Sequence, residues 1–112
     1  METTTMPVGS WHEFFTAYEA AHRNPTNRWI HHATHLAVAG GFCALVAGHA
    51  WGVVPIVAAL PVNWLAHLVF EANQPAFFAP ADAWGKAQVA LGGLVWTAAT
   101  LADDARRLLA SR

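Results

Sequence analysis

Histidine is the residue type in this sequence with the clearest chemical potential. The chain contains seven histidines but only six lysines and arginines together, and most of the histidines flank apolar runs. His31 and His35 are four residues apart, a spacing that places two side chains on one face of a helix. His67 and Glu71 repeat this spacing, which metal-binding helices use. His22 precedes the first pair and can complete a set of ligands from a connecting loop.

Nitrogen and oxygen atoms are the ligands that this chain can offer a metal, because Cys43 is the only cysteine. A lone cysteine provides neither a disulfide framework nor a thiolate cage within one chain. Several imidazoles with a carboxylate and open positions suit Fe(II), and Zn, Mn or Cu are possible on ligand type alone. The predicted metal ligands are His22, His31, His35 and His67. Glu71 is either a ligand or, in our preferred interpretation, a group that orients one.

Two predicted helices position these residues, one over about 27–48 and one over about 53–73. The glycine-containing stretch between them, around residue 50, is typical of a turn, so the helices form an antiparallel hairpin. Positions at equal sequence distance from the turn then lie at the same depth, and the midpoint of His31 and His67 is residue 49. With about 1.5 Å of rise per residue and helix axes about 8–10 Å apart, the two side chains can converge on one ion.

Two further helices complete an all-α fold of about four helices. The first covers about 11–21, where Ser10 is the predicted N-cap and a glutamate three residues later completes a capping box. The last covers about 84–109 and ends in arginines, which are favourable at a helix C-terminus. The chain has 112 residues and no linker-like stretch, so we predict a single domain over residues 1–112.

Composition favours a membrane-embedded bundle. Hydrophobic residues make up 55% of the chain and charged residues 12%, whereas soluble domains carry about 25% charged residues. The apolar part of the second helix covers only about 36–47, although a bilayer crossing takes roughly 20 apolar residues. The first residues do not resemble a cleaved signal peptide. We expect an integral membrane protein, in the inner membrane if bacterial and in the endoplasmic reticulum if eukaryotic.

Charge and small residues indicate which partners to expect. The net charge is −1 and no lysine or arginine cluster is present, which argues against nucleic acid because phosphates require a basic surface. Short helices rich in glycine and alanine pack closely, so a homodimer is plausible. The glycines concerned are Gly40, Gly41, Gly92 and Gly93.

Polar residues beside the histidines are candidates for contacts with substrate. Asn27 either caps a helix or touches the substrate. Arg23 and Arg28 are the only cations near the predicted site; either could hold a substrate carboxylate, or face solvent or lipid phosphate. Together with Glu71, Asn27 and Arg28 are the predicted catalytic residues. The remaining histidines are predicted to be structural or surface residues; they are His12, His32 and His49.

Two blocks of the sequence resemble a known family. The first block contains Tyr18, His22, Asn24, Pro25, Asn27 and His31, and the second contains His67, Phe70, Glu71, Asn73, Pro75 and Ala76. They resemble the Mpo-type family of membrane proteins, once a domain of unknown function, whose founding yeast member is a 2-hydroxy fatty acid dioxygenase. The resemblance covers about residues 11–78. The sequence departs from the family at Thr34, where many members have glycine, and in being shorter than the founding member.

The resemblance implies an Fe(II)-dependent membrane enzyme of several helices. Such an enzyme uses O2 to shorten a 2-hydroxy fatty acid, or a related lipid, by one carbon in α-oxidation. The histidines that carry over are His22, His31 and His67. Two other functions stay open on the residues alone. One is a zinc or di-metal hydrolase acting on a lipid, and the other is a non-catalytic membrane module in which the histidines bind metal or haem.

Overall fold

Helices make up most of the chain in the computed structural model, which describes residues 10–78 and 80–111. Four α-helices lie in the described part: α1 (Trp11–Ala21), α2 (Pro25–Val46), α3 (Val53–Ala66) and α4 (Ala83–Ala110). Three short helical turns lie between α2 and α4: η1 (Ala50–Gly52), the π-helical turn η2 (His67–Glu71) and η3 (Ala76–Phe78). The all-α prediction of about four helices is confirmed.

Side-chain caps determine where the first two helices begin. The hydroxyl of Ser10 accepts a hydrogen bond from the backbone N–H of Glu13 at 3.2 Å, as the predicted capping box requires. Asn24 caps α2, because its Oδ1 accepts from the backbone N–H of Asn27 at 3.3 Å. The second helix therefore begins at Pro25, two residues before the predicted start, with proline in a first-turn position that needs no N–H donor.

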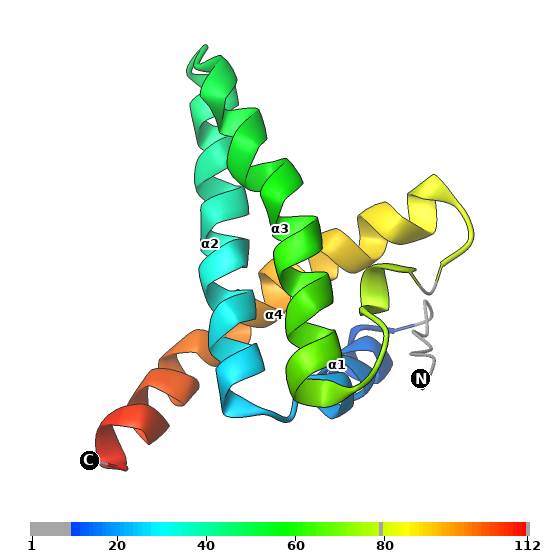
Figure 1. Ribbon diagram of the computed structural model, residues 1–112, viewed down its shortest axis with the longest axis vertical. Helices are drawn as coiled ribbons and strands as arrows, with labels where there is room; N and C mark the ends of the chain where they lie inside the picture. Colours follow the sequence, from blue (N-terminus) through cyan, green and yellow to red (C-terminus); the bar gives the residue numbers. More distant parts are fainter. Residues whose placement is uncertain (1–9, 79, 112) are drawn as a thin grey trace.

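Helices α2 and α3 form the predicted antiparallel hairpin (Figure 1). The two arms touch near the tip, where Gly41 of α2 meets Gly52 of η1. A Cβ atom added at Gly41 would lie 2.5 Å from the carbonyl oxygen of Gly52, and one added at Gly52 would collide with the carbonyl oxygen of Gly41. Only glycine fits at either position, so the two backbones are closed against each other at this end.

The second arm of the hairpin ends differently from the prediction of one helix over 53–73. Regular α-helix stops at Ala66, and one π-helical turn continues through Glu71. Ala72 then adopts a left-handed conformation with φ of 55°, which turns the chain back. As a result Asn73 returns to the side of His67. Short π-helical turns of this kind frequently accompany functional sites.

The fourth helix crosses behind the hairpin, while α1 packs at the base (Figure 1). Trp96 of α4 is fully buried at this crossing. Its ring lies 4.8 Å from the ring of His32 and 4.9 Å from that of Tyr18, and its Nε1 donates to Glu19 at 2.7 Å. This tryptophan therefore joins α1, α2 and α4 in one core.

Glycines also allow α1 to approach α4 closely. A Cβ atom at Gly93 would lie 2.8 Å from the hydroxyl oxygen of Tyr18, and one at Gly92 would run into the ring of Phe14. Gly40, by contrast, has no atom within 4 Å of such a Cβ. Three of the four glycines predicted for close packing thus make close contacts within the chain; they are Gly41, Gly92 and Gly93.

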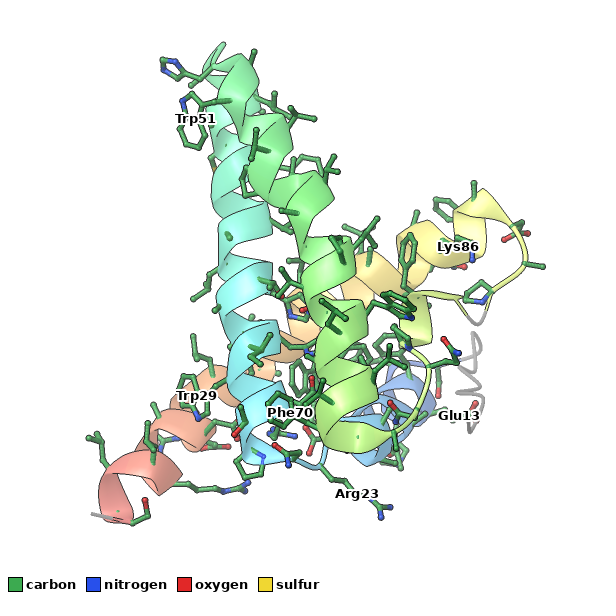
Figure 2. All side chains as sticks on the ribbon, in the orientation of Figure 1. Glu13, Arg23, Trp29, Trp51, Phe70 and Lys86 are labelled. Atoms are coloured by element: carbon green, nitrogen blue, oxygen red, sulfur yellow. The ribbon has the colours of Figure 1, made fainter. Side chains whose placement is uncertain are left out.

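One helical stretch of the described residues, Ala50–Glu71, is long and apolar enough to cross a membrane by length and composition. Its outer surface carries large exposed side chains: Val54, Val57 and Val69 are 63%, 59% and 70% exposed. Trp51 lies at the tip of the hairpin, and Arg23 extends from the opposite end (Figure 2). The surface of the hairpin is therefore apolar between its two ends, and the ends carry both polar and apolar side chains.

Candidate metal centre

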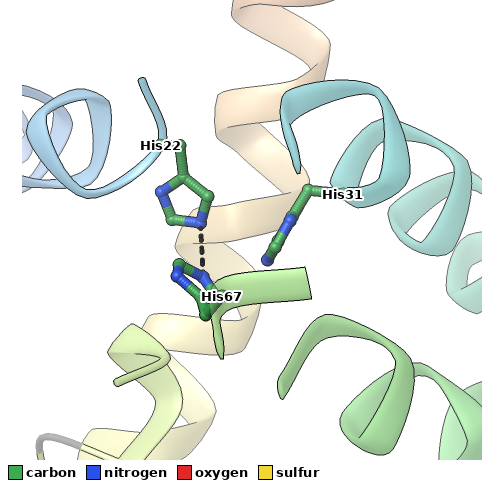
Figure 3. A group of neighbouring side chains, drawn as sticks. All are labelled: His22, His31 and His67. Atoms are coloured by element: carbon green, nitrogen blue, oxygen red, sulfur yellow. Dashed lines mark hydrogen bonds between the residues drawn. The ribbon is translucent and has the colours of Figure 1, made fainter. Parts of the chain in front are cut away.

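Three histidines from three segments of the chain meet at the base of the hairpin. His22 follows α1, His31 lies in the second turn of α2, and His67 begins η2, and their side chains point toward one another (Figure 3). All three are buried, with 2% or less of each exposed, and one ligand nitrogen from each lies within 4.8 Å of the others. The prediction that the two arms bring His31 and His67 together is confirmed, since their ring centroids are 4.8 Å apart.

The rings of these histidines are held by hydrogen bonds on their Nδ1 atoms. In His22, Nδ1 lies 2.7 Å from the backbone oxygen of Tyr18, and in His31 it lies 2.9 Å from the backbone oxygen of Asn27. A carbonyl oxygen only accepts hydrogen bonds, so both Nδ1 atoms must carry the proton and donate it. Each neutral ring then presents an unprotonated Nε2.

His67 is held in the same way by a side chain. Its Nδ1 lies 2.6 Å from Oδ1 of Asn73. The amide group of Asn73 is oriented by its own Nδ2, which donates to the backbone oxygen of Ala21 at 3.3 Å. Oδ1 of Asn73 is therefore the atom that accepts from His67, and His67 shares the tautomer of the other two histidines.

The three rings consequently direct lone pairs toward one another. Nε2 of His22 lies 3.1 Å from Nε2 of His67, the contact drawn as a dashed line in Figure 3. Two neutral rings that are both protonated on Nδ1 have no hydrogen to share at this contact, so a cation between them satisfies it. Two imidazole nitrogens that each lie about 2.1 Å from one ion can be no more than about 4.2 Å apart, and the observed spacing is within this limit.

Burial favours the neutral, ligating form of this set. Removal of His22 from water, followed by the proximity of His31 and His67, holds the pKa of His22 well below its usual value. A histidine in this environment is neutral at physiological pH, and neutral imidazole is the form that binds metals. The residues present therefore fit a metal ion bound by three nitrogens, with positions left for other ligands.

Glu71 does not point at the three histidines but connects the segments that carry two of them. Its Oε1 accepts from the backbone N–H of Asn24 at 2.6 Å and from Nδ2 of Asn27 at 3.2 Å. This carboxylate therefore ties η2 to the first turn of α2. Asn27 is completely buried, and its Oδ1 has no hydrogen-bond partner among the described residues. The cap of α2 is Asn24, so capping is not the role of Asn27.

Arg28 lies in an ion-pair cluster beside the site. Its Nε and Nη2 donate to the two carboxylate oxygens of Asp104 at 3.0 and 3.1 Å, and its Nη1 donates to Glu19 at 3.0 Å. The same Nη1 donates to the backbone oxygen of His22 at 3.1 Å. Arg28 thus anchors the segment that carries a candidate ligand. Arg23 is exposed and extends away from the body of the molecule (Figure 2).

His35 and His32 belong to a second buried network, which sequence reasoning did not identify. Nδ1 of His35 lies 2.6 Å from the hydroxyl oxygen of Thr97, and Nδ1 of His32 lies 3.0 Å from the same atom. Nε2 of His32 lies 2.7 Å from Asp104. His35 stands outside the group of three, so its role as a metal ligand stays a prediction. His12 and His49 are exposed.

An apolar cavity of about 480 Å³ opens beside the histidines. Its polar end contains Tyr18, His22, His31, His35 and His67, and its long wall contains Val38, Phe42, Ile56, Ala59, Leu60 and Leu94. These apolar residues come from α2, α3 and α4. The arrangement therefore combines a cluster of imidazoles with a space suited to an apolar chain.

A comparison with protein-family models identifies the chain. Residues 8–99 match the family described as 2-hydroxy-palmitic acid dioxygenase Mpo1-like. The chain matches no curated protein and no solved structure. The matched segment contains all three histidines of the buried cluster and both sequence blocks that resemble the family. The chain therefore belongs to the Mpo1-like family, which is named as a family of dioxygenases.

Proposed function

We propose that this protein is an Fe(II)-dependent dioxygenase that converts a 2-hydroxy fatty acid to a fatty acid one carbon shorter. The observation that carries the proposal is the convergence of three unprotonated Nε2 atoms at the polar end of an apolar cavity. Three nitrogen ligands leave positions for a substrate and for O2. The family name supplies the expected reaction class.

The proposed reaction balances without a second reductant: R–CHOH–COOH and O2 give R–COOH, CO2 and H2O. The bond between the carboxyl carbon and the hydroxyl-bearing carbon breaks, and the substrate provides all four electrons that O2 accepts. Bound iron would supply the redox chemistry with O2 and a Lewis-acidic centre for the carboxylate and hydroxyl of the acid. His22, His31 and His67 would hold it.

Tyr18 is suited to orient the acid. Its hydroxyl lines the cavity beside the histidines, and its ring lies 4.1 Å from that of His22. Burial raises the pKa of Tyr18, so the hydroxyl keeps its proton and can donate a hydrogen bond to a carboxylate. His35 lies 3.5 Å from this hydroxyl and offers a second polar atom. We propose these two residues as the groups around the reacting end, and Asn27 and Glu71 as positioning residues that hold η2 against the first turn of α2.

The hairpin surface supports a location in a membrane. A substrate with a long acyl chain partitions into lipid, and the cavity opens between helices whose outer surface carries exposed valines and leucines. We propose that the stretch Ala50–Glu71 is immersed in the bilayer together with the apolar part of α2. The substrate then reaches the histidines from the lipid.

Dependence on O2 separates this proposal from its main rival. Zinc hydrolases also use three protein ligands and an open position, so the ligand set alone fits both reactions. A closed structural metal site normally has four protein ligands, and the three histidines here form the one group of three or more potential ligands within the described residues. The proposed dioxygenase requires O2, whereas a hydrolase does not.

The test is turnover of detergent-purified protein supplied with Fe(II) and 2-hydroxypalmitate. We expect O2 uptake with release of equimolar CO2 and pentadecanoate, and no reaction with palmitate, which lacks the hydroxyl. His67→Ala should abolish turnover, whereas His49→Ala, at an exposed histidine, should not. Product formed without O2 would replace the proposal by a hydrolase, and metal binding without any turnover would replace it by a non-catalytic module.

A further inference from the structure

The apolar cavity reaches away from the histidines along both arms of the hairpin. From His31 it follows α2 past Val38 to Phe42, and from His67 it follows α3 past Leu60 to Ile56. Both paths cover eleven residues, which corresponds to about 16 Å at 1.5 Å per residue. The cavity therefore extends along the hairpin from its base toward its tip to a similar depth on both arms.

The contact between the two arms of the hairpin limits the cavity. At Gly41 an added Cβ atom would lie 2.5 Å from the Gly52 oxygen, 3.0 Å from Pro55 and 3.1 Å from Ile56. No space for an acyl chain exists between backbones this close. Phe42 and Ile56 are the lining residues next to this contact. They lie where the end of a bound chain would arrive.

We propose that Phe42 and Ile56 form a stop that sets the longest acyl chain the enzyme accepts. The inference rests on the proposed function, because it assumes that the acid group lies at the histidines. An extended chain advances about 1.2 Å per bond, so 16 Å corresponds to about 13 bonds beyond the reacting carbons. Chains near the length of palmitate fill the cavity, and longer chains meet the stop.

Substitutions at Ile56 test the stop in both directions. Rates of O2 uptake are compared for 2-hydroxylaurate, 2-hydroxypalmitate, 2-hydroxystearate and 2-hydroxyarachidate with the iron-loaded full chain in lipid nanodiscs. We expect Ile56→Ala to improve kcat/KM for 2-hydroxyarachidate relative to 2-hydroxypalmitate by about tenfold. Ile56→Trp should favour 2-hydroxylaurate over 2-hydroxypalmitate by a similar factor. Phe42→Ala should act like Ile56→Ala.

Val57→Ala provides the matched control. Val57 adjoins Ile56 in sequence, is 59% exposed and does not line the cavity, so its removal should leave the chain-length profile unchanged. A profile that stays the same in Ile56→Ala and Ile56→Trp would overturn the inference, as would an equal shift in Val57→Ala.

A binding series keeps this inference separate from the proposed function. Displacement of a fluorescent fatty acid by laurate, palmitate and arachidate measures chain length without turnover. If no 2-hydroxy acid is consumed, the proposed function fails. The stop then stands if Ile56→Ala strengthens binding of arachidate relative to palmitate, and it falls if the order of affinities is unchanged.

Discussion

Hydrogen bonds of the Nδ1 atoms determine which nitrogen carries the proton in each of the three histidines. Spacing in the sequence was enough to predict that His31 and His67 converge, because the antiparallel hairpin follows from the central turn. The tautomer could not be predicted, since it depends on acceptors in other segments. Asn73 reaches His67 only because a π-helical turn and a left-handed Ala72 reverse the chain. In the sequence, the one indication of a role for Asn73 was its place in the second block that resembles the family.

Replacement of Asn73 tests this control of the ring. Asn73→Leu removes the acceptor of the His67 Nδ1–H and leaves a side chain of similar size. Partners of this kind typically change metal affinity by about 10- to 100-fold, so we expect the variant to bind Fe(II) more weakly by that factor. Competition with a chelator of known affinity measures it. An unchanged affinity would show that Asn73 does not orient His67.

At the scale of elements, close contacts place the helices around the site. The sequence predicted both ends of α1, α2 and α4 to within two residues, whereas regular helix in α3 ends at Ala66 rather than 73. It could not predict the position of α4. Arg28 and Asp104 are 76 residues apart, and no periodicity links them. The network of His32, His35 and Thr97 was missed for the same reason, because no periodicity links residues of α2 to residues of α4. His35 has the spacing of a ligand beside His31, yet its Nδ1 is engaged by a residue of α4.

Gly93 is expected to control the distance between α1 and α4. Gly93→Ala introduces a methyl group 2.8 Å from the hydroxyl of Tyr18 and 3.1 Å from Nε2 of His35. Overpacking of this kind costs about 1–3 kcal/mol, so the variant should unfold at a lower temperature and lose activity through displacement of Tyr18. Thermal unfolding in detergent measures the first effect and O2 uptake the second.

Gly40→Ala is the control for this variant. It lies within α2 and has open space around the new methyl group. Alanine is favoured over glycine in a helix interior by about 0.5–1 kcal/mol, so this variant should be at least as stable as the wild type. Equal destabilisation of both variants would contradict the role of Gly93 as a close-contact position.

The ion-pair cluster should stabilise the crossing of α2 and α4. Asp104→Ala leaves Arg28 and His32 without their shared carboxylate in a buried environment. Loss of one partner of a buried pair costs about 3–5 kcal/mol, so the melting temperature should fall steeply. Asp103→Ala changes a neighbouring carboxylate that is exposed and bonded only to Arg106 within the described residues, and its melting temperature should remain that of the wild type. Similar melting temperatures for the two variants would exclude a special role for Asp104.

In the whole molecule, the surface of the hairpin is apolar and the base is polar, so the two parts suit different surroundings. Composition predicted a membrane protein of several helices, and one stretch of the described residues meets the length and hydropathy of a span. The crossing of α4 behind the hairpin could not be read from composition, because it depends on which small residues face each other. The histidines lie near the base of the hairpin, where Arg28 bonds both to Asp104 and to the backbone of His22.

A charge on the middle of the hairpin tests the proposed immersion in lipid. Val57→Lys places an ammonium group on the exposed apolar surface of α3, at a cost of about 2.5–3.5 kcal/mol in a bilayer centre. We expect less of this variant to resist alkaline carbonate extraction from membranes. Ala20→Lys, at an exposed position of α1, should behave as the wild type. Release of the wild-type protein by carbonate would contradict integration.

The most direct test of the central claim is the metal content of the purified protein. Wild-type protein, His67→Ala and His49→Ala are prepared in parallel in detergent under anaerobic conditions with Fe(II), and bound iron is measured per chain. If His22, His31 and His67 hold a catalytic metal, the wild type and His49→Ala will each contain close to one iron per chain, and His67→Ala will contain almost none. Equal iron in all three proteins, or none in any of them, would contradict the account.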